Sequence, residues 1–121
     1  MPEGAEVRII GESLSQKVGL RKLVRIEPIS GRYTKKQIPG LEILQAQIHE
    51  KGPVKVIGVG VKGKLIFWIL SDEIFLLNTL GMTGSWTKNG EHKHARVRFD
   101  FTLGDSVFFS DVRNFGTIKL L

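Results

Sequence analysis

From Val24 to its last residue, the chain is a succession of short runs of β-branched and aromatic residues separated by turn residues. In the clearest run, residues 95–101, apolar side chains alternate with charged or polar ones. An alternation with a period of two is typical of a strand with one buried face. Many short runs of this kind predict an antiparallel β-structure. The predicted strands cover residues 24–27, 44–48, 54–61, 64–70, 74–80, 95–101, 107–110 and 117–121.

Only the first twenty residues have helical spacing. Val7, Ile10, Leu14 and Val18 recur every three or four positions, and Gly19 is placed to end a helix. We therefore predict a mainly β fold, a two-sheet antiparallel β-sandwich or flattened barrel of about eight strands, with an N-terminal α-helix.

A chain of 121 residues is long enough for one domain with a single core. The start is acidic where a secretory signal would be basic, and the longest apolar stretch, residues 65–70, is too short to span a membrane. We therefore expect an intracellular protein, cytoplasmic or nuclear, that is not secreted. The chain stops in an apolar run, residues 118–121, whereas protein ends are more often polar, so we expect a first domain of a longer protein.

The charge balance favours an anionic partner. Eighteen Lys and Arg residues against twelve Asp and Glu give a net charge of +6. Nucleic acid is the commonest partner of such a surface, although a basic surface can also serve solubility alone. The absence of cysteine excludes disulfides and thiolate metal sites.

Two patterns have a simpler interpretation than the function they resemble. Residues 58–63 match the dinucleotide-binding pattern G-x-G-x-x-G, but a predicted strand follows where that motif must open a helix. His92 and His94 could be two metal ligands, but no third ligand is evident nearby, so we predict a basic surface hairpin and no metal or other cofactor in this chain.

The first residues combine an imino acid with two carboxylates. If Met1 is cleaved, Pro2 becomes a secondary amine with an ordinary pKa of about 7.7–8.0, which can attack an electrophilic carbon and form an iminium. Glu3 lies beside it and Glu6 one helical turn further on, where a general acid could act. The alternative is an ordinary helix start, because Pro and acids both suit the first turn.

Four further residues are open to two interpretations each. Lys64 begins an apolar strand, either as an edge residue that prevents aggregation or as a cation that faces phosphate. Met82 lies between two glycines, either as a core filler or displayed on a tight turn. Arg113 and Phe115 lie in a turn between two strands. Exposed Met, Arg and Phe side chains are also typical of the wedge that base-flipping proteins insert into a duplex.

Taken together, four segments resemble the N-terminal domain of the formamidopyrimidine/endonuclease VIII family of DNA glycosylases. They occur in the family's order and span essentially the whole chain. The segments are residues 2–6 (Pro-Glu-Gly-Ala-Glu), 63–65 (Gly-Lys-Leu), 80–84 (Leu-Gly-Met-Thr-Gly) and 111–116 (Asp-Val-Arg-Asn-Phe-Gly).

The resemblance implies a base-excision-repair glycosylase with AP lyase activity on damaged double-stranded DNA, acting as a monomer. In that family the Pro2 nitrogen would attack C1′ of the damaged nucleotide, Glu3 would protonate the sugar-ring oxygen, and Glu6 would support the geometry. Lys64 would contact the phosphate near the damage. The gap left by the flipped nucleotide would be filled by the wedge, for which we predict DNA contacts from Met82, Arg113, Asn114 and Phe115.

Departures from the family pattern change what we expect of the lesion preference and of DNA binding. Gly4 follows the endonuclease VIII variant, which favours oxidised pyrimidines over oxidised purines, and Ala5 replaces a usual proline. Asn114 stands where a second arginine is common. The family's helix–two-turn–helix and zinc-finger elements are absent from this chain, so we expect the isolated domain to bind DNA weakly. A non-catalytic DNA-binding β-sandwich that keeps the family surface is the alternative function.

Overall fold

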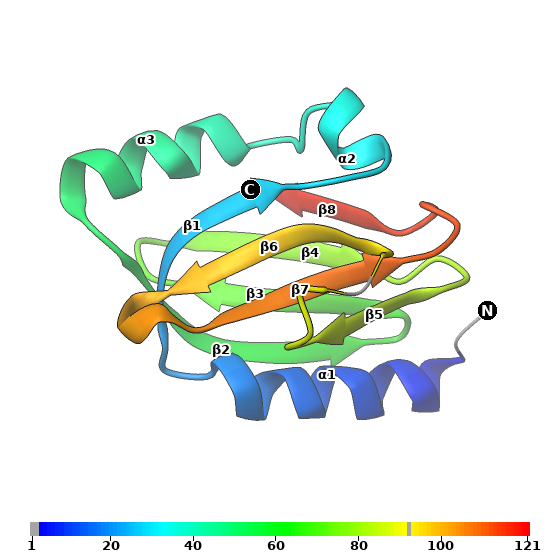
Figure 1. Ribbon diagram of the computed structural model, residues 1–121. Helices are drawn as coiled ribbons and strands as arrows, with labels where there is room; N and C mark the ends of the chain where they lie inside the picture. Colours follow the sequence, from blue (N-terminus) through cyan, green and yellow to red (C-terminus); the bar gives the residue numbers. More distant parts are fainter. Residues whose placement is uncertain (1–2, 92) are drawn as a thin grey trace.

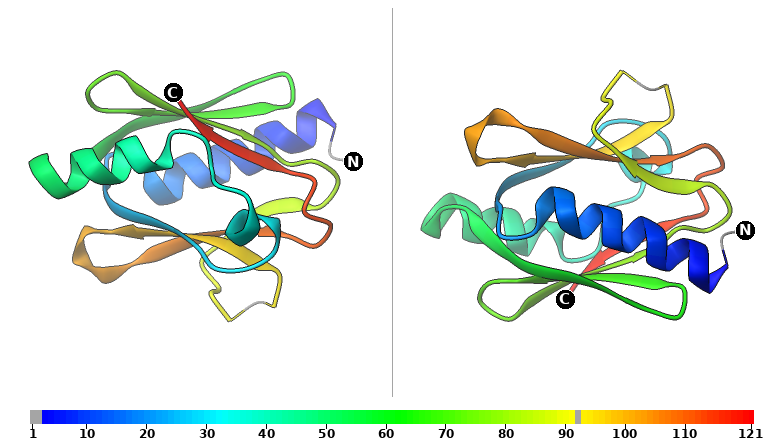
Figure 2. Two further views of the ribbon diagram at one scale, coloured as in Figure 1. Left: turned by 90° about the horizontal axis from the view of Figure 1, so that it is seen from above. Right: turned by 90° about the horizontal axis from the view of Figure 1, so that it is seen from below.

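The computed structural model describes residues 3–91 and 93–121, whose strands form an antiparallel sheet in the order β5-β7-β6-β1-β2-β3-β4-β8. The sheet folds over at its centre, where β1 and β2 pair only through Lys22 with Lys55 and Leu23 with Val54. The two halves then face each other as layers (Figures 1 and 2), which confirms the predicted sandwich. The strands are β1 Lys22–Pro28, β2 Val54–Lys62, β3 Leu65–Leu70, β4 Ile74–Thr79, β5 Gly84–Thr87, β6 Ala95–Phe101, β7 Ser106–Asp111 and β8 Thr117–Leu120.

Aromatic side chains join the two layers. Trp68 of β3 lies with its ring centroid 5.3 Å from that of Trp86 in β5 and 5.1 Å from that of Phe99 in β6. Such pairs add about 0.5–1.5 kcal/mol each beyond the burial of their area. The Trp86 indole N–H donates to the buried Asn78 amide oxygen at 3.0 Å, so a polar group inside the core is also satisfied.

Helix α1, Gly4–Val18, ends directly before Gly19 as predicted, and it buries three of the four residues of the predicted stripe. Val7, Leu14 and Val18 are at most 1% exposed. The helix lies along one open side of the sandwich (Figure 2) and passes close to β2. A Cβ atom added to Gly11 would lie 2.3 Å from Val61 Cγ2, so glycine is required where the helix crosses the strand.

The predicted strand at residues 44–48 is wrong. This segment belongs to helix α3, Leu41–Lys51, which covers the other open side of the sandwich (Figure 1). Leu41 and Leu44, three residues apart, are buried, whereas Ala46, two residues after Leu44, is exposed. The burial therefore follows the period of a helix and not the two-residue period of a strand. The segment is also rich in good helix formers, and it ends at Gly52 with φ +93°.

The structure adds three short elements that the sequence analysis missed. Strand β5 has four residues, helix α2, Arg32–Lys35, has another four, and the 3₁₀ helix η1, Thr102–Gly104, has three. Segments of this length carry no measurable periodicity, because they complete barely two strand repeats or one helical turn. The predicted number of strands, about eight, is therefore right, although the strand predicted at residues 44–48 is a helix and β5 was not predicted.

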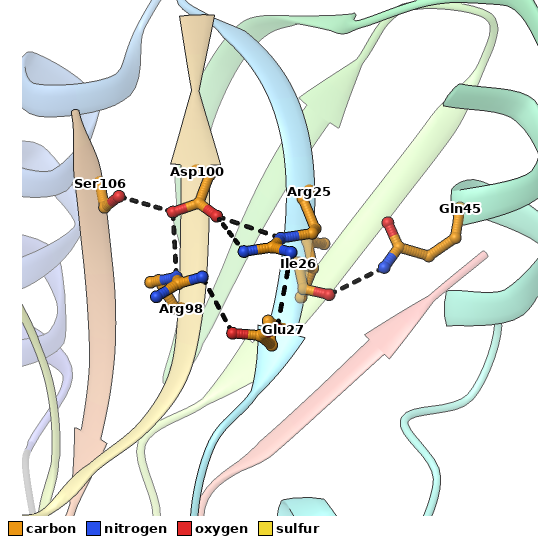
Figure 3. A network of polar contacts seen from close by, with 7 residues as sticks. All are labelled: Arg25, Ile26, Glu27, Gln45, Arg98, Asp100 and Ser106. Carbon is orange, nitrogen blue, oxygen red and sulfur yellow. Dashed lines mark hydrogen bonds and ion pairs between the residues drawn. The ribbon is translucent and has the colours of Figure 1, made fainter. Parts of the chain in front are cut away.

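The outward faces of β1 and β6 carry a network of charged side chains (Figure 3). Arg98 lies 2.9 Å from a Glu27 oxygen and 3.1 Å from an Asp100 oxygen. Arg25 lies 3.2 Å from Asp100, which also accepts a hydrogen bond from Ser106 at 2.6 Å. Exposed pairs of this kind contribute about 0–1 kcal/mol each. Since two cations and two anions balance one another here, the basic excess of the chain must be expressed elsewhere on its surface.

Candidate active site

The first predicted site residues meet where helix α1 begins. Glu3 is the N-cap residue of α1, and one of its carboxylate oxygens lies 3.7 Å from Lys64 Nζ. Lys64 follows Gly63, whose φ of +60° turns β2 directly into β3. The glycine pattern of residues 58–63 therefore ends a strand and opens no helix, as predicted. The turn places the two side chains, sixty-one positions apart in the sequence, within an ion-pair distance of each other.

A hollow of about 460 Å³ opens beside this pair. Val7 of α1 lines it on one side, Lys62 and Lys64 on another, and Thr79 to Gly81 at the end of β4 close it. The lining therefore includes residues of two of the four segments that carry the family resemblance, 63–65 and 80–84, and Val7 directly follows the first segment. Its volume falls in the range of small-molecule sites, about 300–1,000 Å³.

The fourth segment is held against the third by close packing of backbone. Gly81 has φ +59°, and an added Cβ would lie 2.6 Å from the Phe115 carbonyl carbon and 2.7 Å from the Gly116 nitrogen. The Arg113 N–H donates to Thr83 Oγ1 at 2.9 Å. The loop that carries Met82 and the loop that carries Arg113 and Phe115 are thus neighbours. We call these two loops, residues 80–83 and 112–116, the paired loops.

A fully buried carboxylate joins the paired loops. Asp111 Oδ1 accepts from the Thr83 hydroxyl at 2.6 Å, and Oδ2 accepts from the Gly116 N–H at 2.8 Å. The single hydroxyl hydrogen of Tyr33 has two acceptors within reach, the Gly116 carbonyl oxygen at 2.8 Å and the same Oδ2 at 3.2 Å. Bonds to an ionised acceptor are about twice as strong as neutral ones. Asp111 therefore fixes the position of both loops from inside the domain.

The surroundings of Tyr33 raise the pKa of its phenol well above the ordinary value of 10.0. Burial is the largest cause, and the negative charge of Asp111 is the second, while Arg32 opposes both. The phenol consequently stays protonated and keeps donating at any pH near neutrality.

The paired loops display apolar side chains to solvent. Met82 is 43% exposed and Phe115 is 58% exposed, and Arg113 is exposed beside them. The outward placement expected for Met82 on a tight turn is confirmed. Val112 is 50% exposed on the same loop, which the sequence analysis did not single out.

Asn114 differs from its loop neighbours in position. Its φ is +59°, a left-handed conformation that asparagine tolerates better than most residues. The residue is half-buried, and a Cβ added to Gly31 would lie 2.3 Å from its Oδ1, so the side chain packs against that glycine. Its DNA contact stays a prediction.

Some predicted residues are placed elsewhere or not described. Pro2 and His92 lie outside the described residues. Glu6 is exposed in the first turn of α1, one turn beyond Glu3. Asp111 and Lys62 stood inside motifs that the sequence analysis quoted, but only their contacts in the structure show their part in the site. Within residues 3–91 and 93–121, no three His, Asp or Glu side chains are grouped as a metal site, and no helix is long and apolar enough to cross a membrane.

Comparison with known protein families shows to which family the chain belongs. Residues 1–118 match the model of the formamidopyrimidine-DNA glycosylase N-terminal domain. The chain belongs to this family. The formamidopyrimidine-DNA glycosylase of Streptococcus pneumoniae is 34% identical over 129 residues, and that of Wolbachia sp. subsp. Brugia malayi is 30% identical over 125. Both alignments cover all of this chain but only 43% and 44% of the relative, so the chain spans less than half the length of these relatives.

Solved structures of the family have the same fold. Wild-type Lactococcus lactis Fpg in complex with DNA that contains N7-benzyl-Fapy-dG is 25% identical, with a TM-score of 0.81. A mutant of that protein in complex with Fapy-dG-containing DNA gives the same identity and TM-score. In each case the similarity covers 99% of this chain and 43–44% of the solved one. The formamidopyrimidine-DNA glycosylase domain therefore accounts for the whole described chain.

Proposed function

We propose that this domain is the catalytic part of a DNA glycosylase that removes oxidised bases and then cuts the strand as an AP lyase. The observation that carries the proposal is the ion pair of Glu3 and Lys64, 3.7 Å apart, at a hollow whose far side is the loop of Met82. An acid, a cation and an apolar wedge are the groups that excision of a flipped nucleotide requires. The place of Pro2 in the proposal rests on the sequence, since it directly precedes Glu3.

The proposed reaction begins at the Pro2 nitrogen once Met1 has been removed. Its lone pair forms a bond to C1′ of the damaged nucleotide, and the base leaves with the electron pair of the glycosidic bond and is protonated by solvent. The ionised Glu3 takes the N–H proton from the attacking amine and passes it to the sugar-ring oxygen as the C1′–O4′ bond breaks, which leaves an iminium. The iminium acidifies the C2′ hydrogen, so that proton is lost and the 3′ phosphate is eliminated. Water finally hydrolyses the iminium and frees the amine.

The cations beside the hollow can contact the phosphates of the DNA strand that carries the lesion. Lys62 and Lys64 line it, and its described lining includes no acidic side chain. A phosphate held by Lys64 would fix the sugar next to Glu3, because the same ammonium already lies 3.7 Å from that carboxylate. Each phosphate neutralised adds about 0.9 to the slope of log affinity against log salt, so binding should weaken steeply as salt rises.

The paired loops suit the step that makes the nucleotide accessible. A stacked nucleotide does not expose C1′ to an amine, and flipping it costs a few kcal/mol. Met82 and Phe115 are held outward by a buried carboxylate, so they can enter the vacated space without reordering their loops. Inserting the two side chains offsets part of the unstacking energy.

Borohydride trapping tests the proposal on an oligonucleotide duplex with one abasic site. The protein with processed Pro2 should give a covalent adduct, and a form that keeps Met1 should not, because its Pro2 nitrogen is an amide. Glu3→Gln should slow strand cleavage at least tenfold while duplex binding stays within about twofold. If the domain binds the duplex equally well with and without Glu3 but cuts no strand, it is the non-catalytic DNA-binding module. Absence of an adduct from a version with the full length of the relatives would refute the enzyme proposal.

Lesion preference is a separate part of the proposal. Gly4 favours oxidised pyrimidines, whereas the relatives are formamidopyrimidine-DNA glycosylases. Matched duplexes that carry either an oxidised pyrimidine or a formamidopyrimidine, cleaved under single-turnover conditions, distinguish the two. We expect the full-length enzyme to act as a monomer on double-stranded DNA, and sedimentation of the complex would test this.

A further inference from the structure

A second hollow, of about 360 Å³, lies on the open edge of β8, away from the Glu3–Lys64 pair. It is bounded by Thr117 to Lys119 of β8 and by the segment from α2 to Pro39. Tyr33 and Ile38 give it an apolar wall, and its lining includes three cations and no acid. The three cations are Arg32, Lys36 and Lys119.

The register of β8 shows that this edge has an unpaired backbone position. Phe75 and Leu121 exchange two backbone hydrogen bonds, N–H to C=O in both directions. In an antiparallel ladder every second residue pair is bonded in this way, so the backbone groups of Lys119 face Leu77 and those of Thr117 face Thr79. Ile118 and Leu120 therefore turn their N–H and C=O groups away from β4. The Leu120 N–H donates to the Pro39 carbonyl at 2.8 Å, which agrees with this direction.

Both sides of Ile118 on this edge are already occupied. The Gly116 carbonyl accepts from Tyr33 and Arg32, and the Leu120 N–H is bonded to Pro39. Among the described residues, the N–H and C=O of Ile118 have no such partner. Four residues of strand span about 13 Å, so the gap between Gly116 and Leu120 has room for about three residues of an added strand.

We propose that this edge binds a short extended peptide with the pattern acidic–apolar–acidic by β-strand addition. The unpaired N–H and C=O of Ile118 match a peptide group, which offers both an acceptor and a donor, whereas a phosphate offers no hydrogen bond to the carbonyl. A residue opposite Ile118 places its side chain on the face of Tyr33 and Ile38. The two peptide residues that flank this one place their side chains on the same face as Lys119, close enough for the Lys119 charge to attract acidic side chains there.

Titration with N-acetyl-Asp-Val-Asp-amide, followed by the backbone amide signal of Ile118 in a nitrogen-15 spectrum, tests the proposal. We expect a saturable shift of Ile118, at least tenfold weaker apparent binding in Lys36→Glu/Lys119→Glu, and less than a twofold change in the matched control Lys22→Glu/Lys51→Glu. The four lysines are all exposed, so neither double variant should disturb the core.

Four further titrations decide what the edge recognises. The peptide with Lys in place of both Asp residues, and the peptide methylated on its central nitrogen, should each bind at least tenfold more weakly. Equal binding of either one overturns the proposal. If inorganic phosphate saturates the same amide shift, the edge is an anion site and the proposal is overturned. If an undamaged duplex saturates it, and duplex binding weakens in the Lys36/Lys119 variant as much as peptide binding does, the edge is a DNA site and the proposal is likewise overturned. None of these outcomes bears on strand cleavage, which depends on Glu3.

Discussion

Replacing Asp111 by Asn should loosen the paired loops from inside the domain. The carboxylate is fully buried and accepts from Thr83 at 2.6 Å and from the Gly116 N–H at 2.8 Å. Asparagine has nearly the same shape, so no cavity forms. It can keep the bond from Gly116 as a neutral one, while its NH₂ group faces Thr83, whose hydroxyl must then rotate.

The expected loss follows from those two bonds. A hydrogen bond to a charged group contributes about 1.5–3 kcal/mol and a neutral one about 0.5–1.5 kcal/mol, so the two together lose roughly 2–3 kcal/mol. Asparagine is easier to bury than a carboxylate, which offsets part of this. We expect the free energy of unfolding to fall by about 2 kcal/mol, which lowers the urea midpoint by about 1 M at a typical slope.

Tyr33 provides a second measurement of the same substitution. It is the only tyrosine in the chain, so the absorbance of tyrosinate reports on it alone. The Asp111 charge raises the pKa of this phenol, and the pKa should therefore fall in Asp111→Asn. The onset of tyrosinate absorbance should move to lower pH while the protein is still folded.

The matched control is Asp72→Asn, the same chemical change at an exposed carboxylate that accepts one hydrogen bond from Gln47 at 2.9 Å. It should change the free energy of unfolding by less than about 0.5 kcal/mol. If Asp111→Asn costs no more than this control and leaves the tyrosinate onset in place, the carboxylate does not hold the loops and the reasoning fails.

Further expected outcomes concern backbone, charge and pH. Gly81→Ala should cost at least about 2 kcal/mol in urea unfolding, because its Cβ would strike backbone atoms 2.6 Å away, whereas Gly104→Ala, with φ +87° in open space, should cost about 1 kcal/mol. Leu103 is 97% exposed with φ +76° before Gly104, so Leu103→Asn should raise the free energy of unfolding by about 1 kcal/mol, and a decrease would contradict the turn geometry. Lys64→Ala should weaken binding to abasic-site DNA and reduce the salt slope by about one contact, whereas an unchanged slope would remove Lys64 from the phosphate site. Because the folded state raises the pKa of Tyr33 above its ordinary value of 10.0, stability should be complete below about pH 10 and fall above it by up to about 1.4 kcal/mol per pH unit; a flat profile there would refute the assignment.

Much of the fold could be predicted because its elements are long enough to show a period. The stripe of Val7, Leu14 and Val18 predicted α1 and Gly19 predicted its end, while the alternation in residues 95–101 predicted β6. The error at residues 44–48 arose where both periods fit the same apolar residues. Burial decided between them, since only the helix buries Leu41 and Leu44 together.

The sequence by itself determined the chemistry available to this protein: an imino acid followed by a carboxylate, a lysine at a strand start, and Met, Arg and Phe in turn segments. Only the tertiary structure decided that these groups meet. Glu3 and Lys64 face each other because α1 begins where β2 turns into β3, and the paired loops touch because Gly81 leaves room for the backbone of Phe115. The buried bonds of Asp111 and the open edge at Ile118 could not be read from the residues, because burial and register arise only when distant strands pair.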